Sequence, residues 1–212
     1  MKDSLKSANL KLLVSLAGLD TAITFCLAYP HIVEAISLSR LLRASVVPFL
    51  PIVVLLLVEL APHNVKAVLV FWKFKDPLPG HAAFTKHGPS DPRIDMNALQ
   101  RHVGTLPVNP KEQNATWYKL YKRVEADTRV VGAHKAYLLW RDATALSLLL
   151  SIAVPFALWC FDAASSLVRA SLLLFGLQYI LSALAARNSG NRFVCNVLAL
   201  HAAKRITAAS KA

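Results

Sequence analysis

A turn-rich segment in the middle of the sequence collects six polar side chains whose types could bind or transform a ligand. They are three histidines, two aspartates and one arginine: His81, His87, Asp91, Arg93, Asp95 and His102. Histidine and aspartate can exchange protons with a substrate, and an arginine can hold a phosphate through paired hydrogen bonds. If the six converge in a pocket at the membrane surface, they fit an enzyme that acts on lipid or isoprenoid head groups. Scattered and exposed side chains would contradict that interpretation.

A second group mixes large aromatic side chains with cations in the sequence WYKLYKR. Trp117 and Tyr121 could stack on the bases of a nucleotide or nucleic acid, on a helix whose other face carries Lys122 and Arg123. Alternatively, the aromatic side chains form the core of a small domain while the cations face water or lipid. We favour this second interpretation, because the apolar residues recur at the spacing of one helix face.

The histidines and cysteines do not predict a metal centre. Two ligands on one helix must lie three or four residues apart to share a face, and no two of the seven histidines have that spacing. The three cysteines are far apart and odd in number, so they indicate neither a disulfide framework nor a zinc ribbon. The sequence also lacks the motifs of nucleotide-binding glycine loops, serine hydrolases and zinc proteases. We therefore expect no metal and no cofactor.

Three polar residues lie where an apolar helix would pass through the middle of a bilayer. Asp20, Ser151 and Gln178 each fall near the centre of an apolar stretch. A carboxylate at that depth is costly unless it is protonated or paired, so we expect Asp20 to face other helices and to accept hydrogen bonds. The three residues then form an intramembrane polar cluster. It either holds helices together or serves as a site for protons or ions.

Charged residues at the ends of apolar stretches form another group. Glu59 lies near the end of one stretch, and Arg141 and Asp142 come just before another. Lys11 or Arg141 could reach Glu59 by extending its apolar stem. We interpret Glu59, Arg141 and Asp142 as an ion-pair group at the membrane interface rather than as catalytic residues.

The composition indicates what holds these residues in place. The chain has 212 residues, of which 55% are apolar and 17% charged, and its mean hydropathy is +0.44. Soluble domains carry about 25% charged residues, so the composition excludes a disordered chain and an ordinary soluble domain. Four apolar stretches are long enough to cross a bilayer as helices: 10–29, 44–61, 143–160 and 167–186. The predicted fold is an all-α integral membrane protein with four transmembrane helices.

The distribution of basic residues predicts the orientation in the membrane. Of the 24 Lys and Arg residues, all but Arg40, Arg43 and Arg169 lie in the N-terminal, central and C-terminal segments. Basic residues near span ends stay on the cytoplasmic side, so we expect both termini and the central segment in the cytoplasm. The expected location is a bacterial inner membrane. Topology and contact with anionic lipid then account for the net charge of +12, and nucleic acid is not an expected partner.

The central segment, 62–142, predicts a small cytoplasmic domain of loops and helices between the second and third spans. Its first half is rich in proline and glycine, which leaves room for one short helix at 96–103. Asp95 is the expected N-cap of this helix and Gly104 its stop, and Asn109 caps the next helix.

Two longer-range features complete the expected organisation. Helical patterning continues from Thr128 into the third span, so one helix would join the cytoplasmic domain to the membrane. After the fourth span, Ser189, Gly190 and Asn191 predict a stop, followed by an amphipathic helix docked on protein or lipid. The expected regions are an N-terminal pair of spans, the cytoplasmic domain, a second pair of spans and a C-terminal helix with its tail: 1–61, 62–142, 143–187 and 188–212.

No catalytic arrangement stands out, so the favoured function is a non-enzymatic membrane effector or relay. A cytoplasmic protein or a small ligand would engage the cytoplasmic domain, and the continuous helix would move or assemble the spans. We expect such a protein to be a homo-oligomer. The alternative is the head-group enzyme described above. A proton-coupled transporter ranks third, because it needs more than one midplane carboxylate and usually an inverted repeat.

Overall fold

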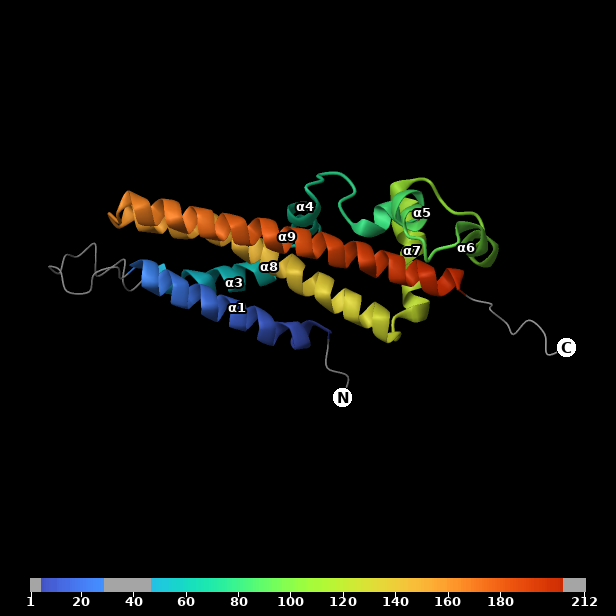
Figure 1. The fold of residues 1–212 in the computed structure, drawn as a ribbon, viewed down its shortest axis with the longest axis horizontal. Helices are drawn as coiled ribbons and strands as arrows, with labels where there is room; N and C mark the ends of the chain where they lie inside the picture. The colour runs from blue at the N-terminus through green and yellow to red at the C-terminus, as the bar shows by residue number, and fades with distance from the viewer. Residues whose placement is uncertain (1–4, 29–46, 204–212) are drawn as a thin grey trace. The chain divides into compact units, whose positions relative to one another are not determined.

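The structure, a computed structural model, describes residues 5–28 and 47–203. Regular structure in these ranges is entirely helical, without a strand (Figure 1). In chain order the elements are α1 (Leu5–Ala28), η1 (Val47–Phe49), α3 (Leu50–Leu60), α4 (His63–Phe71), η2 (Pro79–Ala82), η3 (Ala83–His87), α5 (Gly88–Ser90), α6 (Met96–Val103), α7 (Pro110–Val124), α8 (Thr128–Cys160) and α9 (Ser165–Ala202). The all-α prediction is therefore confirmed for the described residues. Residues 44–46, the start of the second predicted span, lie outside them.

Among the described residues, three helices are long and apolar enough to cross a membrane, namely α1, α8 and α9. A fourth candidate is bent. Residues 47–60 and α4 are long and apolar enough when taken together, but the helix axis bends by 111° between them. The bend has a local cause, since Ala61 precedes Pro62 and has extended backbone angles of −69° and 132°. A residue before proline is sterically disfavoured in helical geometry. The structure thus supports three spans, or four if the bent pair counts as one.

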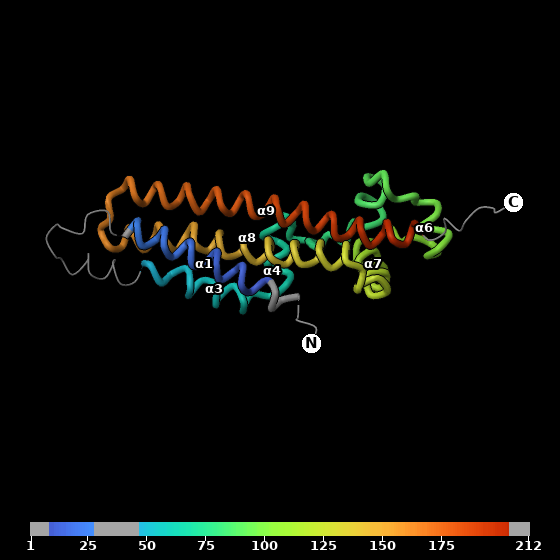
Figure 2. Tube along the Cα trace, turned by 60° about the horizontal axis from the view of Figure 1, so that its bottom comes forward, coloured from blue at the N-terminus to red at the C-terminus, as the bar shows by residue number. Residues whose placement is uncertain are grey.

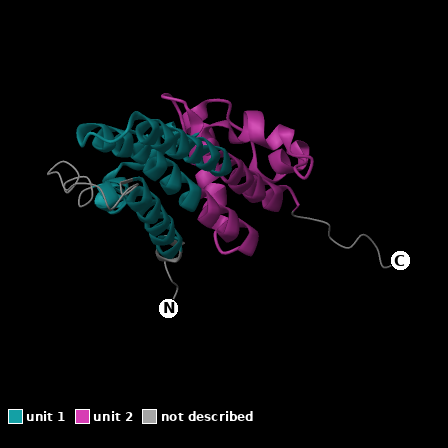
Figure 3. Ribbon diagram, turned by 60° about the vertical axis from the view of Figure 1, so that its left-hand side comes forward, with its two compact units in different colours: residues 1–70, 138–186 teal, residues 71–137, 187–212 magenta. Residues whose placement is uncertain are grey.

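The chain divides into two compact units, each built from two separate stretches (Figure 3). Unit 1 comprises residues 1–70 and 138–186, and unit 2 comprises residues 71–137 and 187–212. Helices α8 and α9 each contribute one part to unit 1 and one part to unit 2.

Unit 1 has an apolar interior and an apolar exterior. Helix α1 packs beside α3, as Figures 1 and 2 both show. Leu146, Leu150 and Phe175 are fully buried in its core. Large apolar side chains are also exposed along all its long helices, including Leu57 of α3 and Leu173 of α9. A surface of this kind suits lipid rather than water, because it would be costly to hydrate.

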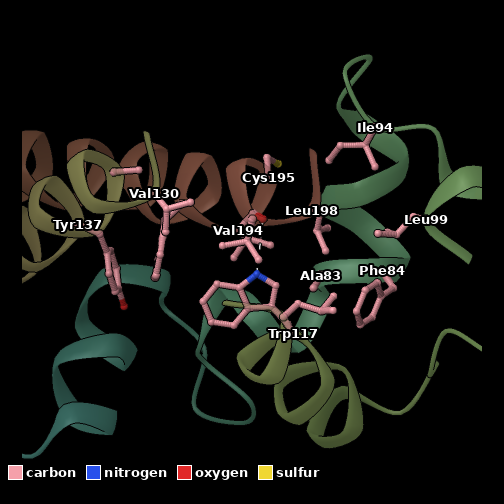
Figure 4. Close-up of a cluster of buried hydrophobic side chains, with 14 residues drawn as sticks. Ala83, Phe84, Ile94, Leu99, Trp117, Val130, Tyr137, Val194, Cys195 and Leu198 are labelled. Carbon is pink, nitrogen blue, oxygen red and sulfur yellow. Dashed lines mark hydrogen bonds between the residues drawn. The ribbon is translucent and has the colours of Figure 1, made fainter. Parts of the chain in front are cut away.

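Unit 2 has a separate core in which Trp117 of α7 packs against α9 (Figure 4). The indole nitrogen of Trp117 donates to the carbonyl oxygen of Val194 at 3.5 Å. The ring of Trp117 meets Phe193 edge-on, with centroids 5.1 Å apart. Leu99 and Leu198 are fully buried in the same cluster. The face of α9 that carries Phe193 and Leu198 therefore docks on protein.

The local helix signals of unit 2 are confirmed. Helix α6 begins after Asp95, whose side chain accepts hydrogen bonds from two backbone N–H groups, and it ends at Gly104 with φ of 94°. Helix α7 begins with Pro110 after Asn109, which caps the backbone N–H of Lys111. The predicted continuous helix from Thr128 into the third apolar stretch is also confirmed, since α8 runs without a break to Cys160.

The predicted stop at Ser189, Gly190 and Asn191 is wrong, because α9 continues through these residues to Ala202. Gly190 has a packing role here instead of a helix-ending one. A Cβ at this position would lie 3.1 Å from atoms of the Phe71 and Tyr137 rings. The missing side chain lets two aromatic rings pack closely against the helix. Residues 188–202 are thus the end of α9 and not a separate amphipathic helix.

Candidate functional site

Unit 2 contains an open cavity of about 530 Å³. The loop after α4, the turns η2 and η3, the start of α7 and helix α9 form its walls. Four of the lining side chains are cationic and one is acidic: Lys73, Lys75, Lys86, Arg187 and Asp76. The cavity walls are therefore strongly basic.

The loop after α4 has left-handed backbone at two positions. The φ angle is 54° at Trp72 and 51° at Asp76, in the left-handed region. Left-handed backbone costs a bulky residue such as Trp72 about 1–2 kcal/mol, whereas aspartate accepts it more readily, so contacts elsewhere must hold the loop at Trp72. The guanidinium carbon of Arg187 lies 3.5 Å from the centre of the Trp72 ring, a close cation–π contact. This contact ties the loop to α9 at the cavity.

Gln113 of α7 fixes the turn on the other side of the cavity. Its side chain is buried, and its Oε1 accepts hydrogen bonds from the backbone N–H groups of Phe84 and Thr85 at 3.0 and 3.2 Å. Its Nε2 donates to the carbonyl of Val108 at 2.7 Å. These bonds hold η3, a single π-helical turn that presents Lys86 and His87 to the cavity. Such turns are uncommon and often mark functional sites.

His81 and His87 are the predicted site residues that line this cavity. The backbone N–H of Leu78 donates to Nδ1 of His81 at 3.1 Å, so a neutral His81 carries its proton on Nε2. That nitrogen lies 3.9 Å from Oδ1 of Asp76. Burial, with smaller effects of Lys86 and Lys73, lowers the pKa of His87 to about 4. His87 is therefore neutral at physiological pH.

The other four polar residues of the turn-rich segment do not line the cavity. Arg93 and Asp91 form an ion pair at 2.7 Å, and this hydrogen bond is the main reason why the pKa of Asp91 is lowered to about 2. A second nitrogen of Arg93 donates to Asn196 at 3.2 Å. Asp95 caps α6, and Nδ1 of His102 donates to the His201 carbonyl at 3.1 Å. These contacts join segments of unit 2 to one another.

The aromatic and cationic residues of α7 divide in the way expected for a packed helix. Trp117 is buried, and Tyr121 packs against Phe193 with ring centroids 5.2 Å apart. Lys122 and Arg123 are exposed, and Lys122 pairs with a glutamate of the same surface at 2.8 Å. The structure therefore presents the two rings to the core of unit 2, and not to the cavity.

In unit 1, the polar residues expected at membrane depth are partly brought together. Nε2 of Gln178 on α9 lies 3.2 and 3.3 Å from the two carboxylate oxygens of Asp20 on α1. Asp20 is only 1% exposed. The hydroxyl of Ser151 donates to the carbonyl of Leu148 within its own helix, α8, at 2.7 Å. The amide side chain of Gln178 thus donates to a buried carboxylate between two apolar helices.

A buried cluster of charges lies close to the bend between α3 and α4. Asp142 accepts from Lys66 at 3.0 Å and from Arg141 at 2.9 Å, and all three side chains are buried. Arg141 also contacts Nδ1 of His63. Glu59 lies on α3 and is half-buried. Of the expected group, Arg141 and Asp142 pair directly, and Lys66 is a partner that the sequence did not suggest.

Several cavity residues were not singled out by their sequence pattern. The lysines and Arg187 looked like ordinary topology signals, since basic residues are common beside spans. Gln113 did carry a signal, because it lies four residues before Trp117 and seven before Leu120, on the apolar face of α7. A polar side chain on such a face must bury its amide and find hydrogen-bond partners.

No protein-family model matches this chain, and neither a curated protein nor a solved structure is similar to it. Among the described residues, no group of three or more histidine, cysteine, aspartate or glutamate side chains is placed to hold a metal ion. What the chain does must therefore be inferred from its cavity and its buried polar pair.

Proposed function

We propose that this chain is a four-span bacterial inner-membrane protein with both termini in the cytoplasm, acting as a non-enzymatic membrane effector or relay. In this arrangement the bent pair of α3 and α4 is the second span. The apolar exterior of unit 1 supports its place in lipid. The cations of unit 2 suit the cytoplasmic side, where anionic lipid attracts them.

One observation supports the relay: α9 contributes residues both to the contact with Asp20 and to the basic cavity. Gln178 of α9 donates to Asp20, and Arg187 and Asn191, further along the same helix, line the basic cavity. A ligand or protein that engages Arg187 therefore acts on the helix that also supplies the hydrogen bond to Asp20.

Displacement of Gln178 would leave the Asp20 carboxylate in an apolar environment. A carboxylate there is costly by several kcal/mol unless a proton, an ion or water reaches it. The relay thus converts an event at the cavity into access of protons, ions or water to the interior of the membrane. Depolarisation of the membrane is the expected consequence.

The test is the membrane potential of bacteria that express the chain, measured with a voltage-sensitive dye at matched membrane levels. Asp20→Asn removes the charge while keeping the size and a hydrogen-bonding group. Asp162→Asn is the matched control, because Asp162 is exposed between α8 and α9 and has φ of 54°, which asparagine tolerates. We expect depolarisation by the wild type and the control, and none by Asp20→Asn. Equal potentials for all three would refute the relay.

A pathway for ions through so few helices needs more than one copy of the chain. We expect the detergent-solubilised protein to be a homo-oligomer, which light scattering would measure. A clean monomer would contradict a pore.

The head-group enzyme is not the better alternative. Of the six polar residues proposed for it, His81 and His87 line the cavity, whereas Arg93 pairs with Asp91 and with Asn196. The arginine that would hold the phosphate is therefore occupied in a structural contact.

A further inference from the structure

We propose that the basic cavity of unit 2 is a binding site for a phosphate-bearing organic ligand. Its volume of about 530 Å³ exceeds the space that inorganic phosphate needs and falls in the usual range for organic ligands. A nucleotide and the head group of an anionic lipid share this chemistry. Binding does not depend on the relay, because the cavity belongs to unit 2 alone.

The charges of the lining side chains favour an anion. Lys73, Lys86 and Arg187 line the cavity together with Lys75, against the single carboxylate of Asp76. Lysine and arginine side chains bind phosphate oxygens through charge-assisted hydrogen bonds. A ligand with two or more negative charges would therefore neutralise a wall that is otherwise strongly positive.

His87 shares this space with the lysines. The side chain of His87 is 8% exposed and lines the cavity. After burial, the effects that lower its pKa come from Lys86 and Lys73, which disfavour another positive charge beside them. An anion between these lysines would reverse that effect and raise the pKa of His87.

The cavity walls are also held in place before any ligand arrives. Gln113 fixes the turn that carries Lys86, and Arg187 is stacked on Trp72. On η2, the hydrogen bond from Leu78 leaves a neutral His81 with an Nε2–H donor. Fixed donors bind a ligand at lower entropic cost than mobile ones, and phosphate oxygens are acceptors.

The test uses the full chain in nanodiscs of phosphatidylcholine and titrates it by calorimetry with ATP and, separately, with glycerol 3-phosphate. The cavity variant is Lys73→Gln with Lys86→Gln, two exposed lysines whose loss should not disturb packing. The matched control is Lys119→Gln with Arg123→Gln, which removes the same charge from exposed positions of α7 that do not line the cavity.

We expect saturable binding of at least one probe by the wild type and the control, and affinity reduced about tenfold or more in the cavity variant. Tighter binding of ATP would indicate a nucleotide. Tighter binding of glycerol 3-phosphate, and loss of its binding in nanodiscs that contain phosphatidylglycerol, would indicate a lipid head group.

Either failure to bind both probes or equal weakening in the two double variants would overturn the proposal. NMR of labelled histidines supplies a second readout, since the saturating probe should raise the pKa of His87. A membrane potential unaffected by the chain would refute the relay and leave this result standing, so the two failures are distinguishable.

Discussion

Gln113 should determine whether the turn beside the cavity keeps its shape, and Gln113→Leu tests this. The substitution keeps a side chain of similar size but removes the acceptor for two backbone N–H groups and the donor to Val108. Phe84 is buried, so its N–H would lose its partner in a place that water reaches poorly. Thr85 and Val108 are exposed and can turn to water instead.

The expected loss follows from these differences in burial. A buried N–H without a partner costs about 1–3 kcal/mol, and each exposed bond adds only a fraction of that. We therefore expect local destabilisation of about 2–3 kcal/mol, or a rise of about 30- to 150-fold in the opening of η3. Hydrogen–deuterium exchange at residues 84–87 measures this opening directly.

Gln100→Leu is the matched control for this prediction, because Gln100 is exposed on α6. We expect it to leave exchange at residues 84–87 unchanged. If Gln113→Leu also leaves the amides of Phe84 and Thr85 exchanging at the rate of the wild type, the buried amide does not hold the turn and the reasoning is wrong.

Two further predictions concern buried charge. The pKa of His87 is lowered from 6.5 to about 4 in the folded chain. Between these two values the unfolded chain binds more protons than the folded chain. The stability that is present above pH 6.5 is therefore lost as the pH falls toward 4. The loss should reach about 3 kcal/mol, and His87→Gln should flatten this part of the pH profile of thermal unfolding. In unit 1, Asp142→Asn leaves the buried cations Lys66 and Arg141 without the carboxylate that they share, which should cost about 3–5 kcal/mol. Glu125→Gln breaks the exposed pair with Lys122 and should cost less than about 1 kcal/mol, so equal shifts in the unfolding midpoint would contradict the prediction.

The helices of unit 2 could be predicted where their ends depend on neighbouring residues. Asp95 and Asn109 act as caps through their own side chains, and Gly104 adopts a positive φ that few other residues accept. These effects operate over one helical turn, so the sequence pattern contains them.

Features that depend on distant residues could not be predicted in the same way. Glycine is the residue type that most often ends a helix, so Gly190 resembles a helix stop in the sequence. Its role depends instead on Phe71 and Tyr137, which reach it only in the folded chain. The cavity likewise assembles cations from the loop after α4, from η3 and from α9. Each lysine alone satisfies the rule for membrane orientation, so nothing in its local pattern indicates that four cations share one cavity.

The position of Val194 and Leu198 in the last turns of α9 has a consequence for biosynthesis. These residues complete the core around Trp117, so unit 2 stays unfinished until the ribosome has released the last turns of α9. A nascent chain in which α9 is misplaced cannot deliver them to that core. It would display Trp117 and Leu120 to chaperones and proteases. Completion of the core of unit 2 thereby depends on correct placement of α9.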